Sequence, residues 1–145
     1  MATTHVSAFE STLQKTHAWL DELVRDAGYE DESQAYTALR AVLHVLRDRL
    51  IVNEAAHLGA QLPMLIRGFY YEGWHPAKTP RDDLHNAAQF IQAVRHELRN
   101  AAVSIDPEHA IRAVFKLLRE KVTQGEIQDI KGELPKDLQE LWPPG

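Results

Sequence analysis

The feature that most constrains the fold of this chain is an internal repeat. The segment Leu39–Asp48 returns as Ile111–Glu120 at an offset of 72 residues, and this register holds without a gap to the pair Tyr70 and Trp142. A fixed internal period is the sequence signature of a duplicated structural unit. The repeat therefore predicts the architecture, whereas the chemistry has to be sought in individual residues.

Apolar residues recur at helical spacing near the start of each half. In the first half the stripe consists of Phe9, Leu13, Leu20, Leu23 and Ala27, and in the second half it consists of Leu84, Ile91, Val94 and Leu98. Leu13 and Leu84 are matched at an offset of 71 residues. A stripe of this width is typical of a helix that packs one face on a core. We therefore expect both stripes to face the core.

A third helical segment in each half is interrupted by proline. Asn53 is placed to open this segment in the first half, and Thr123 with Glu126 forms a capping-box pattern in the second. Proline inside a helix costs about 3 kcal/mol. We therefore expect Pro63 and Pro135 each to begin a new short helix.

These patterns predict an all-α protein, because no segment alternates as a strand would. We expect a helical bundle of two tandem three-helix repeats with approximate twofold pseudosymmetry, in a single domain over residues 1–145. Repeat one covers about 8–72, an aromatic connector about 69–80, and repeat two about 81–142. The connector is rich in aromatic residues, unlike a flexible linker, so we expect it to be packed.

Several stretches resemble a known family. They are Ala38–Leu43, Leu46–Leu50, Gln61–Pro63 running into Gly68–Trp74, and the later Leu134-Pro135 and Leu141-Trp142. Together they resemble a bacterial helical family known as domain of unknown function 2267, over roughly residues 8 to 142, and the Tyr-Tyr-Glu-Gly-Trp run is the most specific part. The resemblance implies an all-helical, two-repeat fold and brings no activity, cofactor or catalytic residue.

Composition excludes several classes of protein. The chain has no cysteine, so disulfides, thiol nucleophiles and iron–sulfur clusters are ruled out. The formal net charge of −5 disfavours nucleic acid and anionic membranes as partners. The N-terminus lacks the apolar region of a signal peptide, and no apolar run approaches the roughly 18–20 residues that span a bilayer. We expect a cytoplasmic protein with no membrane partner.

No motif for catalysis or metal binding is found. The pattern His-x-x-x-His does not occur, and His96-Glu97 is followed by Asn100 where a zinc-protease motif needs its second histidine. Nucleophile elbows and phosphate-binding glycine loops are also lacking. We therefore expect no catalytic residues, no metal site and no cofactor.

Basic side chains along one edge of the second helix of each half are candidate binding residues. They include two arginines per half: Arg40, Arg47, Arg112 and Arg119. Under a twofold relation they could form one cationic surface for carboxylate or phosphate. Alternatively, they lay their stems on apolar surface and bond an exposed helix C-terminus or an acid such as Glu54 or Glu126. Both glutamates also recur at the 72-residue spacing, which favours an internal pair. The sequence favours the internal role and leaves both open.

The connector supplies a second group of candidates, which has no copy after Trp142: Tyr70, Tyr71, Glu72 and Trp74. Tryptophan and tyrosine are enriched at binding hot spots. A segment present in only one repeat can bind a partner, or it can simply join the two repeats. The sequence favours the joining role.

The function that fits these observations is a non-catalytic helical interaction or ligand-binding module. Its partner would be a protein or a small anionic ligand, and a homo-oligomer fits as well. The alternative is a small enzyme or metabolite-binding protein with a pocket at the repeat junction, lined by Tyr70, Trp74 and the arginines. An enzyme should show a deep pocket that holds a titratable group with a shifted pKa.

Overall fold

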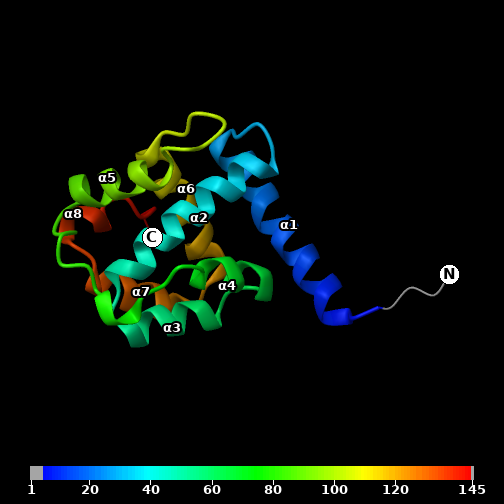
Figure 1. Cartoon of the computed structure of the whole chain (residues 1–145), viewed down its shortest axis with the longest axis horizontal. Coiled ribbons are helices and arrows are strands. Elements are labelled where there is room, and N and C mark those ends of the chain that lie inside the picture. The colour runs from blue at the N-terminus through cyan, green and yellow to red at the C-terminus, as the bar shows by residue number, and fades with distance from the viewer. Residues whose placement is uncertain (1–4, 145) are drawn as a thin grey trace.

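The computed structural model describes residues 5–144, and every regular element within them is a helix (Figure 1). The all-helical prediction is therefore confirmed. The elements are α1 (Ser7–Ala27), α2 (Glu32–Arg49), α3 (Val52–Ala60), α4 (Met64–Tyr71), a 3-10 turn (Pro76–Lys78), α5 (Ala87–Glu97), α6 (Pro107–Lys121), α7 (Gln124–Glu133) and α8 (Lys136–Gln139).

Helices α2 and α6 form the centre of the molecule. Helix α2 contacts α1, α4, α5 and α6, and α6 also contacts α1, α5 and α7. All residues of Ala41–Arg47 are buried, so this part of α2 is covered on every side rather than along one stripe. Leu39 and Leu43 of α2 and Phe115 of α6 have no exposed surface and form part of this core.

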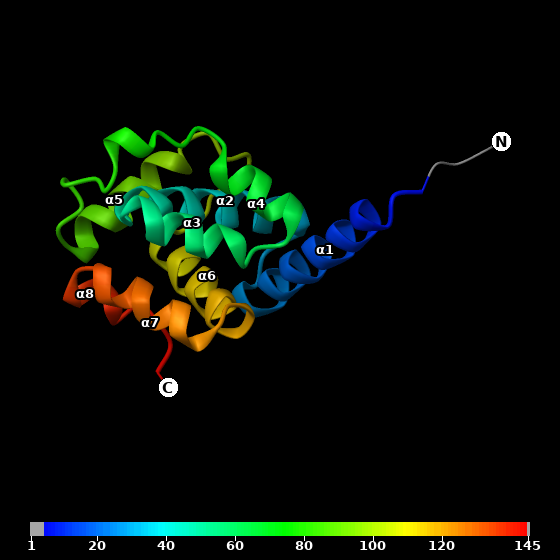
Figure 2. The same cartoon turned by 90° about the horizontal axis from the view of Figure 1, so that it is seen from below.

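Helix α1 extends beyond the rest of the molecule (Figures 1 and 2). From Thr16 onward it packs on the core through Thr16, Trp19, Leu20 and Leu23, and it ends at Gly28 in the left-handed conformation. The expected core stripe is therefore wrong at its first two positions, since Phe9 is 59% exposed and Leu13 is 48% exposed. Helical periodicity identified the face correctly, but these residues lie past the edge of the body.

The two prolines act as the sequence predicted. Pro63 immediately precedes α4 and Pro135 immediately precedes α8, so each proline starts a new short helix. The expected start of α3 is wrong, because Ile51 and not Asn53 is its N-cap residue. At the start of α7, Thr123 accepts a hydrogen bond from the backbone N–H of Glu126 at 3.4 Å.

The aromatic side chains of the connector are packed, as expected, whereas Pro76–Lys78 are exposed. The Tyr71 and Trp74 rings lie 5.2 Å apart, and both pack against the core while remaining partly exposed. The backbone N–H of Arg81 donates to the Asp48 carbonyl at 2.7 Å, which ties the end of the connector to α2.

Candidate functional site

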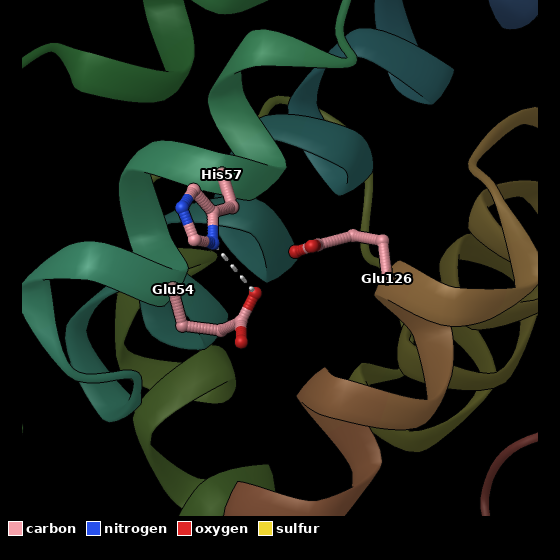
Figure 3. Close-up of side chains that lie close together, drawn as sticks. All are labelled: Glu54, His57 and Glu126. Atoms are coloured by element: carbon pink, nitrogen blue, oxygen red, sulfur yellow. Dashed lines mark ion pairs between the residues drawn. The ribbon is translucent and has the colours of Figure 1, made fainter.

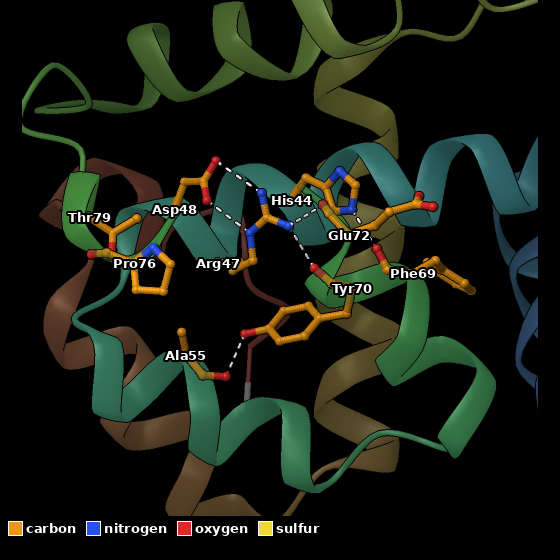
Figure 4. Close-up of polar contacts among 9 residues, drawn as sticks. All are labelled: His44, Arg47, Asp48, Ala55, Phe69, Tyr70, Glu72, Pro76 and Thr79. Carbon is orange, nitrogen blue, oxygen red and sulfur yellow. Dashed lines mark hydrogen bonds and ion pairs between the residues drawn. The ribbon is translucent and has the colours of Figure 1, made fainter. Parts of the chain in front are cut away.

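Arg47 is used inside the fold. Its side chain is 4% exposed and donates through Nη1 to the carbonyls of Tyr70 (2.7 Å) and Glu72 (2.8 Å) (Figure 4). Its Nε donates to Asp48 Oδ1 at 2.9 Å. The last carbonyls of a helix have no hydrogen-bond donor within the helix. Arg47 supplies a donor to these carbonyls at the C-terminal end of α4. This geometry supports the internal role that the sequence favoured for Arg47.

His44 serves the same helix end. Its Nε2 lies 2.6 Å from the Phe69 carbonyl, so the ring donates from this nitrogen (Figure 4). Burial, opposed by this hydrogen bond and assisted by Arg47 and Arg40, lowers the pKa of His44. The neutral ring is therefore the form that fits the fold.

The connector candidates assemble around these two side chains. Tyr70 is fully buried and its hydroxyl donates to the Ala55 carbonyl at 2.7 Å. Glu72 receives a hydrogen bond from Arg40 Nη2 at 2.8 Å on the surface, and this ion pair lowers the pKa of Glu72. Six of the eight predicted residues thus come together as the joint between α2, α4 and the connector: Arg40, Arg47, Tyr70, Tyr71, Glu72 and Trp74.

The second-half arginines act separately from this joint. Arg112 Nε lies 3.2 Å from Glu108 Oε2 one turn earlier. Arg119 donates to the Pro144 carbonyl at 2.6 Å and lines an open cavity of about 240 Å³ with Lys131 and Trp142. Because Arg47 is buried, the four arginines do not form the single cationic surface that the sequence allowed.

Within residues 5–144, the expected pairs between these arginines and the two repeated glutamates do not form. Glu54 on α3 and Glu126 on α7 instead direct their carboxyl groups toward each other, with His57 beside them (Figure 3). Burial first, and then the neighbouring Glu54, raises the pKa of Glu126 to about 8. The recurrence of both glutamates was the available signal, but their mutual contact depends on how α3 and α7 pack.

An exposed apolar surface was also not predicted from the sequence. We name it the α1–α4 apolar face, and it consists of exposed side chains at the start of both helices: Val6, Phe9, Leu13, Met64 and Leu65. The two helices meet here, since the backbone N–H of Leu65 donates to Thr12 Oγ1 at 2.8 Å. Clustered exposed apolar side chains mark interaction surfaces more often than isolated ones do.

This is a helical protein with a buried polar joint and an acidic pair between two of its helices. It belongs to the family described as Uncharacterized conserved protein (DUF2267), whose match spans residues 16–141 and confirms the resemblance seen in the sequence. The curated proteins compared with the chain give no match. Over residues 5–144, none of the helices combines the length and apolarity needed to cross a membrane.

Proposed function

We propose that this protein is a non-catalytic interaction module that binds an amphipathic helix of a partner protein on the α1–α4 apolar face. One observation carries this proposal: Leu13 is 48% exposed, whereas Leu84, its match in the second half, is 2% exposed. In the second half the chain covers this apolar position itself. In the first half the same position is left for another polypeptide.

The spacing along α1 favours a helical partner. Phe9, Leu13, Thr16, Leu20 and Leu23 follow one another at intervals of four and three residues. Such a seam accommodates a second helix with knobs-into-holes packing. The last three residues of the seam are buried in the core, so the first two, together with Met64 and Leu65, are available to the partner.

A duplicated architecture supports this comparison of the two halves. We propose two three-helix repeats related by an approximate twofold axis. In support, α2 ends at Arg49 and α6 at Lys121, while α3 begins at Val52 and α7 at Gln124, each pair 72 residues apart. The N-terminal part of α1, before residue 16, lies outside the matched family segment.

The alternative of an enzyme or metabolite-binding pocket at the junction has less support. Tyr70 is fully buried and Arg47 is engaged with backbone carbonyls, so neither side chain is free to contact a substrate. The cavity at Arg119 is open and holds no acid or histidine among its lining residues.

Site-specific photo-crosslinking tests the proposal. A photoreactive amino acid replaces Leu13 in one variant and Val103, which is 40% exposed on a loop, in the control variant. The full chain is expressed in its native cells, irradiated, and the crosslinked peptides are mapped by mass spectrometry. We expect crosslinks from position 13 to a helical segment of one partner protein and none to that segment from position 103. Crosslinks only between copies of this chain, or equal crosslinking at both positions, would contradict it.

A further inference from the structure

The contact between α3 and α7 contains two glutamates that do not accept the hydrogen bond usual for their position at the start of a helix. Glu54 and Glu126 are each the third residue of their helix, where a glutamate commonly accepts a hydrogen bond from the N-cap backbone N–H. In this protein the N-cap N–H of each helix donates instead to a side chain at the C-terminal end of the other helix. Ile51 N–H donates to Glu133 Oε1 at 2.9 Å, and Thr123 N–H donates to Gln61 Oε1 at 2.8 Å. Both glutamates are thereby free to turn toward each other.

The two carboxyl groups are buried without enough partners. The Glu54 side chain is 9% exposed and Glu126 is 6% exposed. Oε2 of each is buried and makes no hydrogen bond. A buried carboxylate is stable only when a donor or a cation compensates it. Two arrangements can compensate the acidic pair: a proton shared between the carboxyl groups, which agrees with the raised pKa of Glu126, or a cation bound between their oxygens.

His57 completes a set of three donor groups. Its Nδ1 lies 3.8 Å from Glu54 Oε2, and one donor atom from each of Glu54, His57 and Glu126 falls within 4.8 Å of the others (Figure 3). The His57 side chain is 68% exposed, so the cluster opens to solvent on this side. That opening provides an entry path for an ion.

We propose that Glu54, His57 and Glu126 together bind one divalent first-row transition cation, of which Zn²⁺ is the probe. Such ions hold oxygen and nitrogen ligands at about 2.0–2.2 Å, so two ligands can lie up to about 4.4 Å apart. A small side-chain rotation brings the present spacing within that limit. The imidazole favours a transition metal over Mg²⁺ or Ca²⁺, which prefer oxygen ligands alone.

The bound ion would link α3 of the first half to α7 of the second. Asp129 and Glu133 lie close enough to act on the charge of Glu126, so the surroundings are also acidic and attract a cation. This site is independent of the proposed partner face, which lies on α1 and α4. No metal motif was recognised in the sequence: Glu54 and His57 are three residues apart on α3, but Glu126 comes from α7 and reaches them only through tertiary packing.

The test is zinc binding to the full chain, measured by isothermal titration calorimetry after removal of metals with a chelator. The ligand variants are Glu54→Gln, Glu126→Gln and His57→Gln. Asp129→Asn is the matched control, because it removes an exposed acid one turn after Glu126 without removing a ligand. Thermal melts with and without zinc report whether each variant is folded and whether the ion stabilises it.

We expect one Zn²⁺ per chain for the wild type, a loss of about tenfold or more in affinity for each ligand variant, and affinity within about threefold of wild type for Asp129→Asn. Zinc should raise the melting temperature of the wild type and not that of Glu126→Gln. If a glutamate variant fails to fold, His57→Gln decides, because this side chain is exposed. The proposal is overturned if the wild type binds no stoichiometric zinc, or if His57→Gln binds zinc as tightly as the wild type.

Discussion

The two halves carry a matched leucine in different settings: Leu13 lies on helix α1, whereas Leu84 lies in the loop before α5. Helix α1 has 21 residues and leaves Leu13 at its exposed end, whereas α5 has 11 residues and begins only at Ala87, so the expectation that Leu84 belongs to a helical stripe is wrong. Leu84 is buried there, and its carbonyl accepts a hydrogen bond from Arg49 Nε at 3.0 Å. The same apolar pattern thus contributes to the core in one half and to a surface in the other.

Matched polar positions diverge in the same way. Arg47 caps the end of α4 from within the core, while Arg119 contacts a terminal carbonyl at the surface. His44 is buried, while Lys116 at the matched position pairs with Asp26 on the surface at 3.1 Å. The first half therefore buries polar side chains at positions where the second half exposes them. The following substitutions test that difference.

The largest effect on stability is expected for the tryptophans that follow the two proline-interrupted helical segments. Trp142 is 5% exposed and stacks on Phe115 with ring centroids 4.1 Å apart. Trp142→Ala should lower the free energy of unfolding by about 3–5 kcal/mol, as for a buried aromatic residue. Trp74→Ala should cost about 1–3 kcal/mol, because this ring is only partly buried. Urea denaturation measures both, and equal losses would mean that the connector is as central to the fold as the C-terminus.

Arginine substitutions should separate the two halves next. Arg47→Gln leaves the Tyr70 and Glu72 carbonyls without their donor and should lower the free energy of unfolding by about 2–4 kcal/mol. Arg119→Gln should change it by less than about 1 kcal/mol, since its contact is at the surface. The two variants are compared by chemical denaturation. A stable Arg47→Gln protein would remove the internal role assigned to this side chain.

The smallest effect concerns pH. Since burial lowers the pKa of His44, the unfolded chain binds this proton more tightly than the folded one does. The stability contributed by neutral His44 is therefore present above pH 6.5 and is lost as pH falls below it, by up to about 1.4 kcal/mol per pH unit. Melting curves from pH 7 to pH 5 should show a smaller loss for His44→Gln than for the wild type. Parallel curves would indicate that His44 titrates normally.

Local chemistry explains which parts of the fold the sequence could predict. The prolines at positions 63 and 135 act within a few residues, so their effect on helix boundaries was accessible. The exposure of Phe9 and Leu13 could not be predicted from the sequence. Periodicity identifies the apolar face of a helix, but it does not show where the rest of the protein stops covering that face.

The candidate sites were predictable only in part. The aromatic connector and the edge arginines were singled out from the sequence, and a bond from such an arginine to a helix C-terminus was one of the alternatives. Which helix end Arg47 reaches depends on tertiary packing and carries no sequence signal. The approach of Glu54 to Glu126 depends on Gln61 and Glu133, which take over the N-cap hydrogen bonds from the opposite helix region. Such an exchange requires tertiary contacts and leaves no short motif.

The most direct test of the central claim is the free energy of unfolding of Leu13→Ala and Leu84→Ala, measured side by side in urea. Leu84→Ala should lose about 2–5 kcal/mol, as expected for a buried leucine. Leu13→Ala should stay within about 0.5 kcal/mol of the wild type, since substitutions at exposed positions rarely exceed this. Similar losses in both variants would contradict the account, because they would show that the first half buries this apolar position as the second half does.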